Sequence, residues 1–165
     1  MKKATKKDIE YIRDYFIKNY SGMVTELAFR NDYELLIAII LSAQCTDKRV
    51  NMITPALFEK YPDPQALANS NLDDVKEYLK TCSFFNNKAE NIIKMARSVV
   101  EDHEGKIPHE KKDLIALAGV GNKTANVFLI EADGANLMAV DTHVFRVSHR
   151  LGLSQAKTVE ATEAD

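Results

Sequence analysis

A short glycine-flanked turn separates two segments of helical apolar spacing within residues 114–127, LIALAGVGNKTANV. The pattern breaks at Gly119-Val120-Gly121 and resumes directly behind it, which predicts that one helix ends at Gly119 and another begins near Asn122. Two glycines allow a turn too tight for residues with a Cβ, and Val120 is expected to point into the core. Backbone N–H groups and the dipole of the second helix would then form an anion site that suits a sugar–phosphate backbone.

Lys123 is a candidate nucleophile, because it lies in the first turn of that second helix. A free lysine has a pKa near ~10.4 and is protonated at neutral pH, so a nucleophilic lysine needs a lowered pKa. The positive end of a helix and partial burial both disfavour an ammonium group, and the position of Lys123 supplies the first condition. The alternative is a lysine with an ordinary surface role.

Asp141 is a candidate fixed negative charge. It precedes Thr142-His143-Val144, where another segment of helical spacing begins. An aspartate at this position is a good helix N-cap, and backbone N–H donors keep such a carboxylate ionised. The capping role and a chemical role are therefore compatible.

The composition predicts an all-α globular protein. Hydrophobic residues make up 45% of the 165 residues, there are only six glycines and four prolines, and helical spacing recurs along the chain. The net charge of −2 argues against a uniformly basic nucleic-acid-binding protein. A DNA-binding face would need its lysines and arginines gathered locally.

The two cysteines, Cys45 and Cys82, lie among apolar residues and favour isolated buried thiols. There is no CxxC pattern, so no metal site is predicted. The apolar run at residues 35–41 is too short to cross a bilayer, and no signal peptide is recognised. These features predict a cytoplasmic protein without a membrane partner.

Four segments together resemble the endonuclease III family of DNA glycosylase/AP lyases, within the helix–hairpin–helix glycosylase superfamily. They are ELLIAIILSAQCTD at 34–47, NNKAENI at 86–92, LAGVGNKTA at 117–125 and VDTHVFRV at 140–147. Their order and spacing are similar to those of the family, from about Glu26 to Leu153. Ala118 replaces a common proline and Asn122 a frequent basic residue, and neither touches Lys123 or Asp141.

The resemblance implies two helical domains, of which the second is incomplete. Residues 1–20 are assigned to the second domain as its N-terminal helix. Residues 21–135 form the domain with the helix–hairpin–helix motif at 114–130, and residues 136–165 begin the C-terminal part of the second domain. Family members continue into further helices and a cysteine-rich loop with a 4Fe-4S cluster. We therefore expect a chain truncated at its C-terminus, with no cofactor of its own and a 4Fe-4S cluster only in the complete family member.

The resemblance further implies base-excision repair, with Lys123 and Asp141 matching the catalytic lysine and aspartate of the family. The implied enzyme is a bifunctional DNA glycosylase/AP lyase that removes oxidised pyrimidines and cleaves abasic sites through a Schiff base and β-elimination. Gln44 matches a glutamine that fills the space of the extruded nucleotide, and Phe84 falls where the family has an apolar wedge. Their alternatives are a polar helix-end residue and a core aromatic residue.

The residues predicted to contact DNA are Gln44, Phe84, Gly119, Val120, Gly121 and Thr124. The expected partner is double-stranded DNA with a damaged base or an abasic site, bound by a monomer in the bacterial cytoplasm at the nucleoid. A monofunctional DNA glycosylase is one alternative, which Lys123 disfavours. A non-catalytic helix–hairpin–helix DNA-binding fragment is the other, which Asp141 and its context disfavour. The truncated chain by itself is not assumed to be active.

Overall fold

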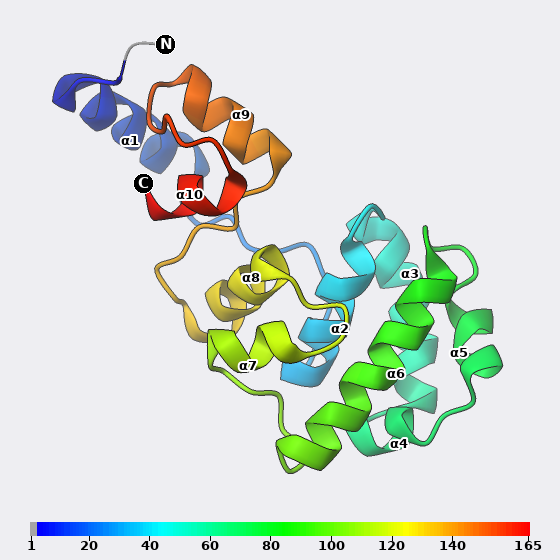
Figure 1. Ribbon diagram of the computed structural model, residues 1–165. Coiled ribbons are helices and arrows are strands. Elements are labelled where there is room, and N and C mark those ends of the chain that lie inside the picture. Colours follow the sequence, from blue (N-terminus) through cyan, green and yellow to red (C-terminus); the bar gives the residue numbers. More distant parts are fainter. Residues whose placement is uncertain (1–2) are drawn as a thin grey trace. The chain divides into compact units, whose positions relative to one another are not determined.

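The computed structural model describes residues 3–165, which form ten helices and no strand (Figure 1). In chain order these are α1 (Lys6–Tyr20), α2 (Asp32–Ser42), α3 (Asp47–Lys60), α4 (Pro64–Ala68), α5 (Leu72–Leu79), α6 (Phe85–Asp102), α7 (Lys111–Ala116), α8 (Asn122–Asp133), α9 (Thr142–Arg150) and α10 (Val159–Ala164). The prediction of an all-α protein is confirmed.

The chain divides into two compact units. The central unit, Glu26–Ala135, contains α2 to α8. The terminal unit joins Met1–Thr25 to Asn136–Asp165 and contains α1, α9 and α10. The assignment of residues to the two domains of the family stays a prediction. In the part of the chain that the structure describes, no helix is long and apolar enough to cross a membrane.

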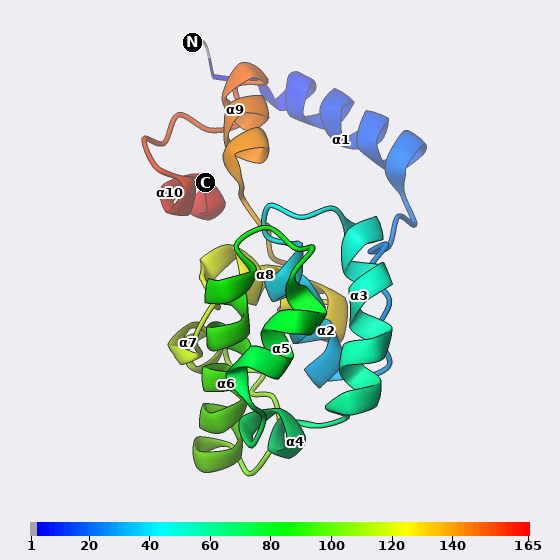
Figure 2. The same cartoon turned by 90° about the vertical axis from the view of Figure 1, so that its right-hand side faces the viewer.

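Helix α2 is the centre of the central unit and packs against α3, α6 and α8 (Figures 1 and 2). Every residue from 33 to 41 is buried, as expected for a helix that is apolar on all sides. Asn31 caps its start by accepting the Glu34 N–H at 3.0 Å. The buried Glu34 carboxylate is not orphaned, because it accepts hydrogen bonds from the backbone N–H and the guanidinium of Arg30, each at 2.8 Å.

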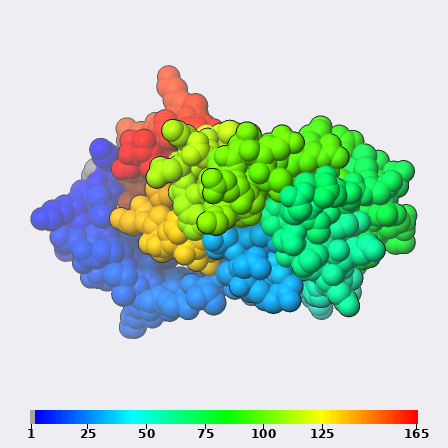
Figure 3. All heavy atoms as spheres, turned by 90° about the horizontal axis from the view of Figure 1, so that it is seen from below, coloured from blue at the N-terminus to red at the C-terminus, as the bar shows by residue number. Residues whose placement is uncertain are grey.

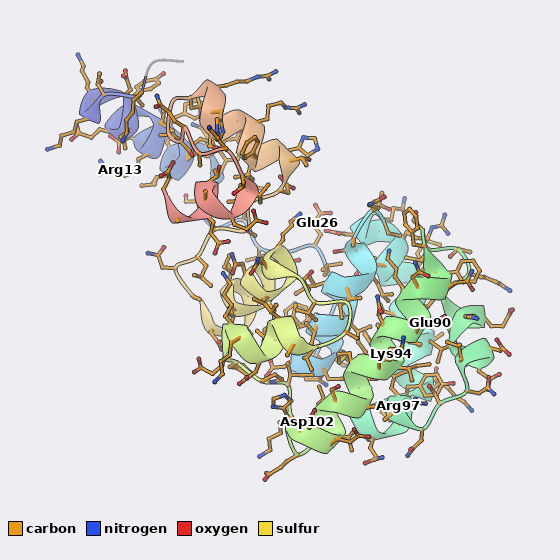
Figure 4. All side chains as sticks on the ribbon, viewed as in Figure 1. Arg13, Glu26, Glu90, Lys94, Arg97 and Asp102 are labelled. Carbon is orange, nitrogen blue, oxygen red and sulfur yellow. The ribbon has the colours of Figure 1, made fainter. Side chains whose placement is uncertain are left out.

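Apolar spacing predicts a helix over residues 88–103, and helix α6 begins three residues earlier, at Phe85. Its cationic side chains bind the carboxyl ends of two other helices. Arg97 donates to the carbonyl of Ala68 at the end of α4, at 3.2 Å (Figure 4). Lys88 reaches the end of α2 in the same way. Cations at helix C-termini satisfy carbonyls that have no partner within the helix.

Pro55 lies inside the apolar pattern of the segment that forms α3, which predicts a kink or a division there. Helix α3 continues through Pro55, so it is not divided. Proline deprives the carbonyl four residues earlier of its helical N–H partner. Pro55 is exposed and Asn51 is only half-buried, so water can solvate the carbonyl that Pro55 leaves without a donor.

His109 joins the ends of α2 and α8. Its Nδ1 lies 2.7 Å from Asp133 Oδ1 and its Nε2 lies 3.1 Å from Asp32 Oδ2. In the view from below, light-blue residues of α2 lie beside the yellow residues of α8 (Figure 3). Because both ring nitrogens face carboxylates, only the protonated imidazolium can donate to both at once.

The terminal unit has little buried surface. Neither α1 nor α9 contains a buried residue. Thr5 caps α1 in a reciprocal arrangement with Asp8, which donates its backbone N–H and accepts the Thr5 N–H at 2.8 Å. The His149 ring contacts the carbonyls of Phe145 and Ala156, each at 2.7 Å, and thereby links α9 to the segment before α10.

Candidate active site

The glycine-flanked turn between α7 and α8 is a compact hairpin, as its sequence predicted. The N–H of Val120 donates to the carbonyl of Leu117 at 3.2 Å, and the first turn of α8 is closed by the Ala125 N–H to the Gly121 carbonyl at 2.9 Å. Val120 is buried in the core of the central unit. The inward-pointing side chain that pins the turn is therefore present.

The two glycines of the turn differ in backbone conformation and in the space around them. Gly119 has a φ of +81°, and a Cβ built on it would lie 3.0 Å from the Cβ of Asn91 on α6. Gly121 has a φ of −96° and a ψ of 179°, which any residue adopts, and nothing lies within 4 Å of a Cβ built there. The expectation that both glycines serve the tightness of the turn is right for Gly119 and wrong for Gly121. The space beside Gly121 is open to a ligand that approaches the backbone closely.

The N-terminus of α8 carries the candidate nucleophile. Gly121 is its N-cap, so no capping side chain binds the first N–H groups of this helix. Lys123 lies in that first turn and is exposed, while Thr124 next to it is half-buried. Lys123 therefore lies at the helix N-terminus, as its sequence position predicted, and is not buried.

Asp141 is the N-cap of α9. Its Oδ1 accepts the backbone N–H groups of His143 and Val144, each at 2.9 Å. The capping interpretation is confirmed. Asp141 belongs to the terminal unit and Lys123 to the central unit.

Gln44 and Phe84 share an uncommon backbone conformation. Both are non-glycine residues in the left-handed region, with φ of +54° for Gln44 and +56° for Phe84. Such conformations persist only where the surroundings impose them, and they are frequent at functional sites. Gln44 is exposed in the connection between α2 and α3. Phe84 is 63% exposed, whereas Phe85 packs against the core, so the core alternative is wrong for Phe84.

The Lys88 side chain contacts residues close in sequence to Gln44 and Phe84, and its buried position was not predicted from the sequence. Its Nζ lies 2.8 Å from the carbonyl of Leu41, 2.6 Å from that of Ala43 and 3.3 Å from the sulfur of Cys82. A signal was available, because Lys88 stands four residues before Ile92 on the apolar face of α6, where a charged side chain needs a buried partner.

A protein-family model matches most of the chain. Residues 37–165 match the HhH-GPD superfamily base excision DNA repair protein model. Endonuclease III of Haemophilus influenzae (strain ATCC 51907 / DSM 11121 / KW20 / Rd) is 51% identical over 139 residues, which are 84% of this chain and 66% of that protein. This chain belongs to the endonuclease III family.

Solved structures agree with this assignment to the endonuclease III family. A structure of a non-covalent endonuclease III–DNA complex is similar to this chain with a TM-score of 0.91 and 41% identity. A trapped endonuclease III–DNA covalent intermediate, an estranged-adenine complex, is similar with a TM-score of 0.92 and 41% identity. Each similarity covers 98% of this chain and 76% of the other chain. The chain spans about two thirds to three quarters of the length of the curated relatives that it matches.

The cysteines do not fit an endonuclease III iron–sulfur cluster. Within residues 3–165 no group of three His, Cys, Asp or Glu side chains could hold a metal ion, and both cysteines are free thiols. A 4Fe-4S cluster takes four thiolates, and Cys45 and Cys82 are the two that this sequence supplies. Burial raises the pKa of the Cys82 thiol, which makes it a poorer ligand still.

Proposed function

We propose that this chain carries the nucleophile and the DNA-binding hairpin of a bifunctional DNA glycosylase/AP lyase. The proposed substrates are oxidised pyrimidines and abasic sites in double-stranded DNA. The observation that carries the proposal is Lys123, exposed in the first turn of α8 behind the Gly119–Gly121 turn. A relative with this fold has been trapped as a covalent intermediate with DNA, and Lys123 provides an amine for such a bond.

The proposed reaction begins with extrusion of the damaged nucleotide, whose C1′ is inaccessible inside the base stack. The Lys123 amine attacks C1′, the glycosidic bond breaks, and the base leaves with the bonding electron pair and takes up a proton. Opening of the sugar ring gives an iminium between C1′ and the lysine nitrogen. Loss of a C2′ proton then expels the 3′ phosphate with the C3′–O electron pair, and water hydrolyses the iminium to restore the amine.

Two features favour the free amine of Lys123 in the complex. The N-terminus of α8 has partial positive charge, which destabilises an ammonium held there. DNA bound over an exposed lysine would also remove it from water, which adds to this destabilisation. Asp141 is proposed as the carboxylate that stabilises positive charge on the sugar and assists the loss of the Lys123 proton. No step passes through a metal, and a 4Fe-4S cluster is proposed only for the complete family member.

The hairpin is proposed to bind the DNA backbone. The N–H groups at the start of α8 lack a capping side chain, and the open space beside Gly121 permits close approach of a phosphate. Thr124 is the neighbouring polar contact. The Val120 side chain is buried and its N–H donates to the Leu117 carbonyl. Val120 is therefore proposed to anchor the turn in the core. Gln44 and Phe84 are proposed to fill the space left by the extruded nucleotide and to separate the adjacent bases.

We further propose that the protein acts as a monomer on the bacterial chromosome, in the cytoplasm. Borohydride reduction of the iminium on an abasic-site duplex tests the enzymatic proposal. Wild-type protein should be trapped covalently, and Lys123→Ala should not. Lys112→Ala removes an exposed lysine from the start of α7, outside the motif at 114–130, and should leave trapping unchanged. Normal trapping of Lys123→Ala would refute the proposed mechanism, and DNA binding without any trapping of the wild type would favour a non-catalytic binding module.

A further inference from the structure

A single buried ammonium group connects the two loops that carry Gln44 and Phe84. Lys88 is 6% exposed, and its three N–H donors have three acceptors: the carbonyls of Leu41 and Ala43 and the sulfur of Cys82. None of the described ion pairs joins this ammonium to a carboxylate. A buried charge of this kind costs free energy, and a methionine of similar length would fill the same space without that cost.

The first loop, residues 43–46, is fixed through the end of α2. Leu41 and Ala43 lie at the carboxyl end of this helix, where carbonyls lack helical partners and the dipole favours a cation. Gln44 directly follows Ala43 and adopts its left-handed conformation there. The Lys88 ammonium therefore holds the carbonyl of the residue next to Gln44.

The second loop, residues 81–84, is fixed by the same residue. Cys82 contacts the Lys88 ammonium and lies two positions before Phe84. The backbone N–H of Lys88 donates to the carbonyl of Phe84 at 3.1 Å, in the first turn of α6. Cys82 also donates its thiol to the Leu41 carbonyl at 3.5 Å, which closes the connection between the two loops.

We propose that Lys88 is a positioning residue that sets the spacing of Gln44 and Phe84, so that both side chains enter the DNA together when a nucleotide is extruded. The inference rests on the proposed function and adds to it a residue that does not touch the substrate. A left-handed conformation at two non-glycine residues needs such an external constraint. Displacement of a substrate-positioning group by about 1 Å can lower a rate by about 100-fold.

The test compares a duplex with a single strand. In single-stranded abasic DNA there is no stack to open, so trapping by Lys123 needs neither Gln44 nor Phe84. Lys88→Met keeps the buried stem and removes the ammonium contacts. It should lower the rate of borohydride trapping on an abasic-site duplex by about tenfold or more and leave the rate on the single strand within about twofold. The unstacking signal of 2-aminopurine beside the abasic site should fall in parallel.

The matched control is Lys94→Met on the same helix. Lys94 is 62% exposed and pairs with Glu90 at 3.7 Å, so its loss should change neither rate (Figure 4). A duplex rate for Lys88→Met equal to that of wild type would overturn the inference, as would an equal loss on duplex and single strand. No trapping of the wild type on either substrate would instead be a failure of the proposed function.

A double-mutant cycle separates positioning from general destabilisation. In protein that already carries Gln44→Ala and Phe84→Ala, the further change Lys88→Met should have little effect on the duplex rate, because its action passes through those two side chains. A full tenfold effect in that background would contradict the inference. Should Lys88→Met not fold, Cys82→Ala carries the test, because it removes the sulfur contacts to the Lys88 ammonium and the Leu41 carbonyl and leaves the ammonium bonded to both carbonyls. A wild-type duplex rate for Cys82→Ala would then overturn the inference.

Discussion

Gly119 in the hairpin and Asn91 on α6 approach so closely that a Cβ at position 119 would lie 3.0 Å from the Asn91 Cβ. The contact places the hairpin against a helix that is distant in the sequence. It also separates the roles of the two hairpin glycines, since Gly121 has open space at the corresponding position. The packing of the hairpin against α6 requires a glycine at position 119, whereas open space surrounds the backbone of Gly121.

This difference predicts opposite effects of alanine at the two positions. Gly119→Ala should lower the free energy of unfolding by about 1–3 kcal/mol, from left-handed strain and the Asn91 contact. Gly121→Ala should change stability by less than about 1 kcal/mol, because its backbone accepts a side chain. It should nevertheless weaken duplex binding by about tenfold, the loss of roughly one phosphate hydrogen bond. Urea denaturation and fluorescence anisotropy measure the two effects, and undiminished affinity in Gly121→Ala would exclude the hairpin as a DNA contact.

Substitutions of Asp141 should distinguish the effect of its helix-capping hydrogen bonds from the effect of its negative charge. Asp141→Asn keeps an oxygen that accepts the N–H groups of His143 and Val144, whereas Asp141→Ala loses the cap and should destabilise α9 by about 1 kcal/mol. Both variants lose the negative charge. Base excision should therefore fall in both, and cleavage of pre-formed abasic sites should fall less. Helix content by circular dichroism and single-turnover excision give the comparison, and normal excision by Asp141→Asn would show that capping is the whole role of Asp141.

The contacts of His109 predict a pH-dependent contribution to the stability of the central unit. Burial lowers the pKa of His109, but its hydrogen bonds to Asp133 and Asp32 outweigh burial and raise the pKa above the ordinary 6.5. A group with a raised pKa in the folded state stabilises fully below its unfolded pKa, and this stabilisation is lost as the pH rises through the folded pKa. The difference in unfolding free energy between wild type and His109→Gln should therefore be larger at acidic than at alkaline pH.

The control for this measurement is His103→Gln, which removes a half-buried histidine of the same unit. The described ion pairs of a histidine with a carboxylate are those of His109, so His103→Gln removes none of them and should not reproduce the effect of His109→Gln. Urea denaturation across the range from about pH 4.5 to about pH 8.5, about two units on either side of the ordinary histidine pKa, resolves the effect. An unchanged difference for His109→Gln over this range would show that His109 does not link α2 to α8 in solution.

The terminal unit should open more readily than the central unit. Because α1 and α9 contain no buried residue, few apolar contacts oppose their local unfolding. Amide hydrogens of α1 and α9 should exchange well before those of α2, in which residues 33–41 are all buried. Hydrogen exchange followed by mass spectrometry of peptides resolves the two units. Equal protection of α1 and α2 would contradict this account.

The sequence by itself determined the features that depend on neighbouring residues. An apolar run without a polar face made α2 the core helix, and the residues around Asp141 made it the cap of α9. The hairpin was recognisable because glycines and helical spacing act over a few residues. The same local patterns carried the resemblance to endonuclease III, which the comparisons confirmed.

The tertiary structure alone decided the features that depend on distant residues. The hydrogen bonds from Lys88 to the Leu41 and Ala43 carbonyls join positions 45 to 47 residues apart. No periodicity within one segment encodes such a partner. The open space at Gly121 likewise depends on which atoms of other segments come near it. Local spacing thus placed the helices and the candidate nucleophile, and packing between helices determined the surroundings of the two exposed residues Gln44 and Phe84.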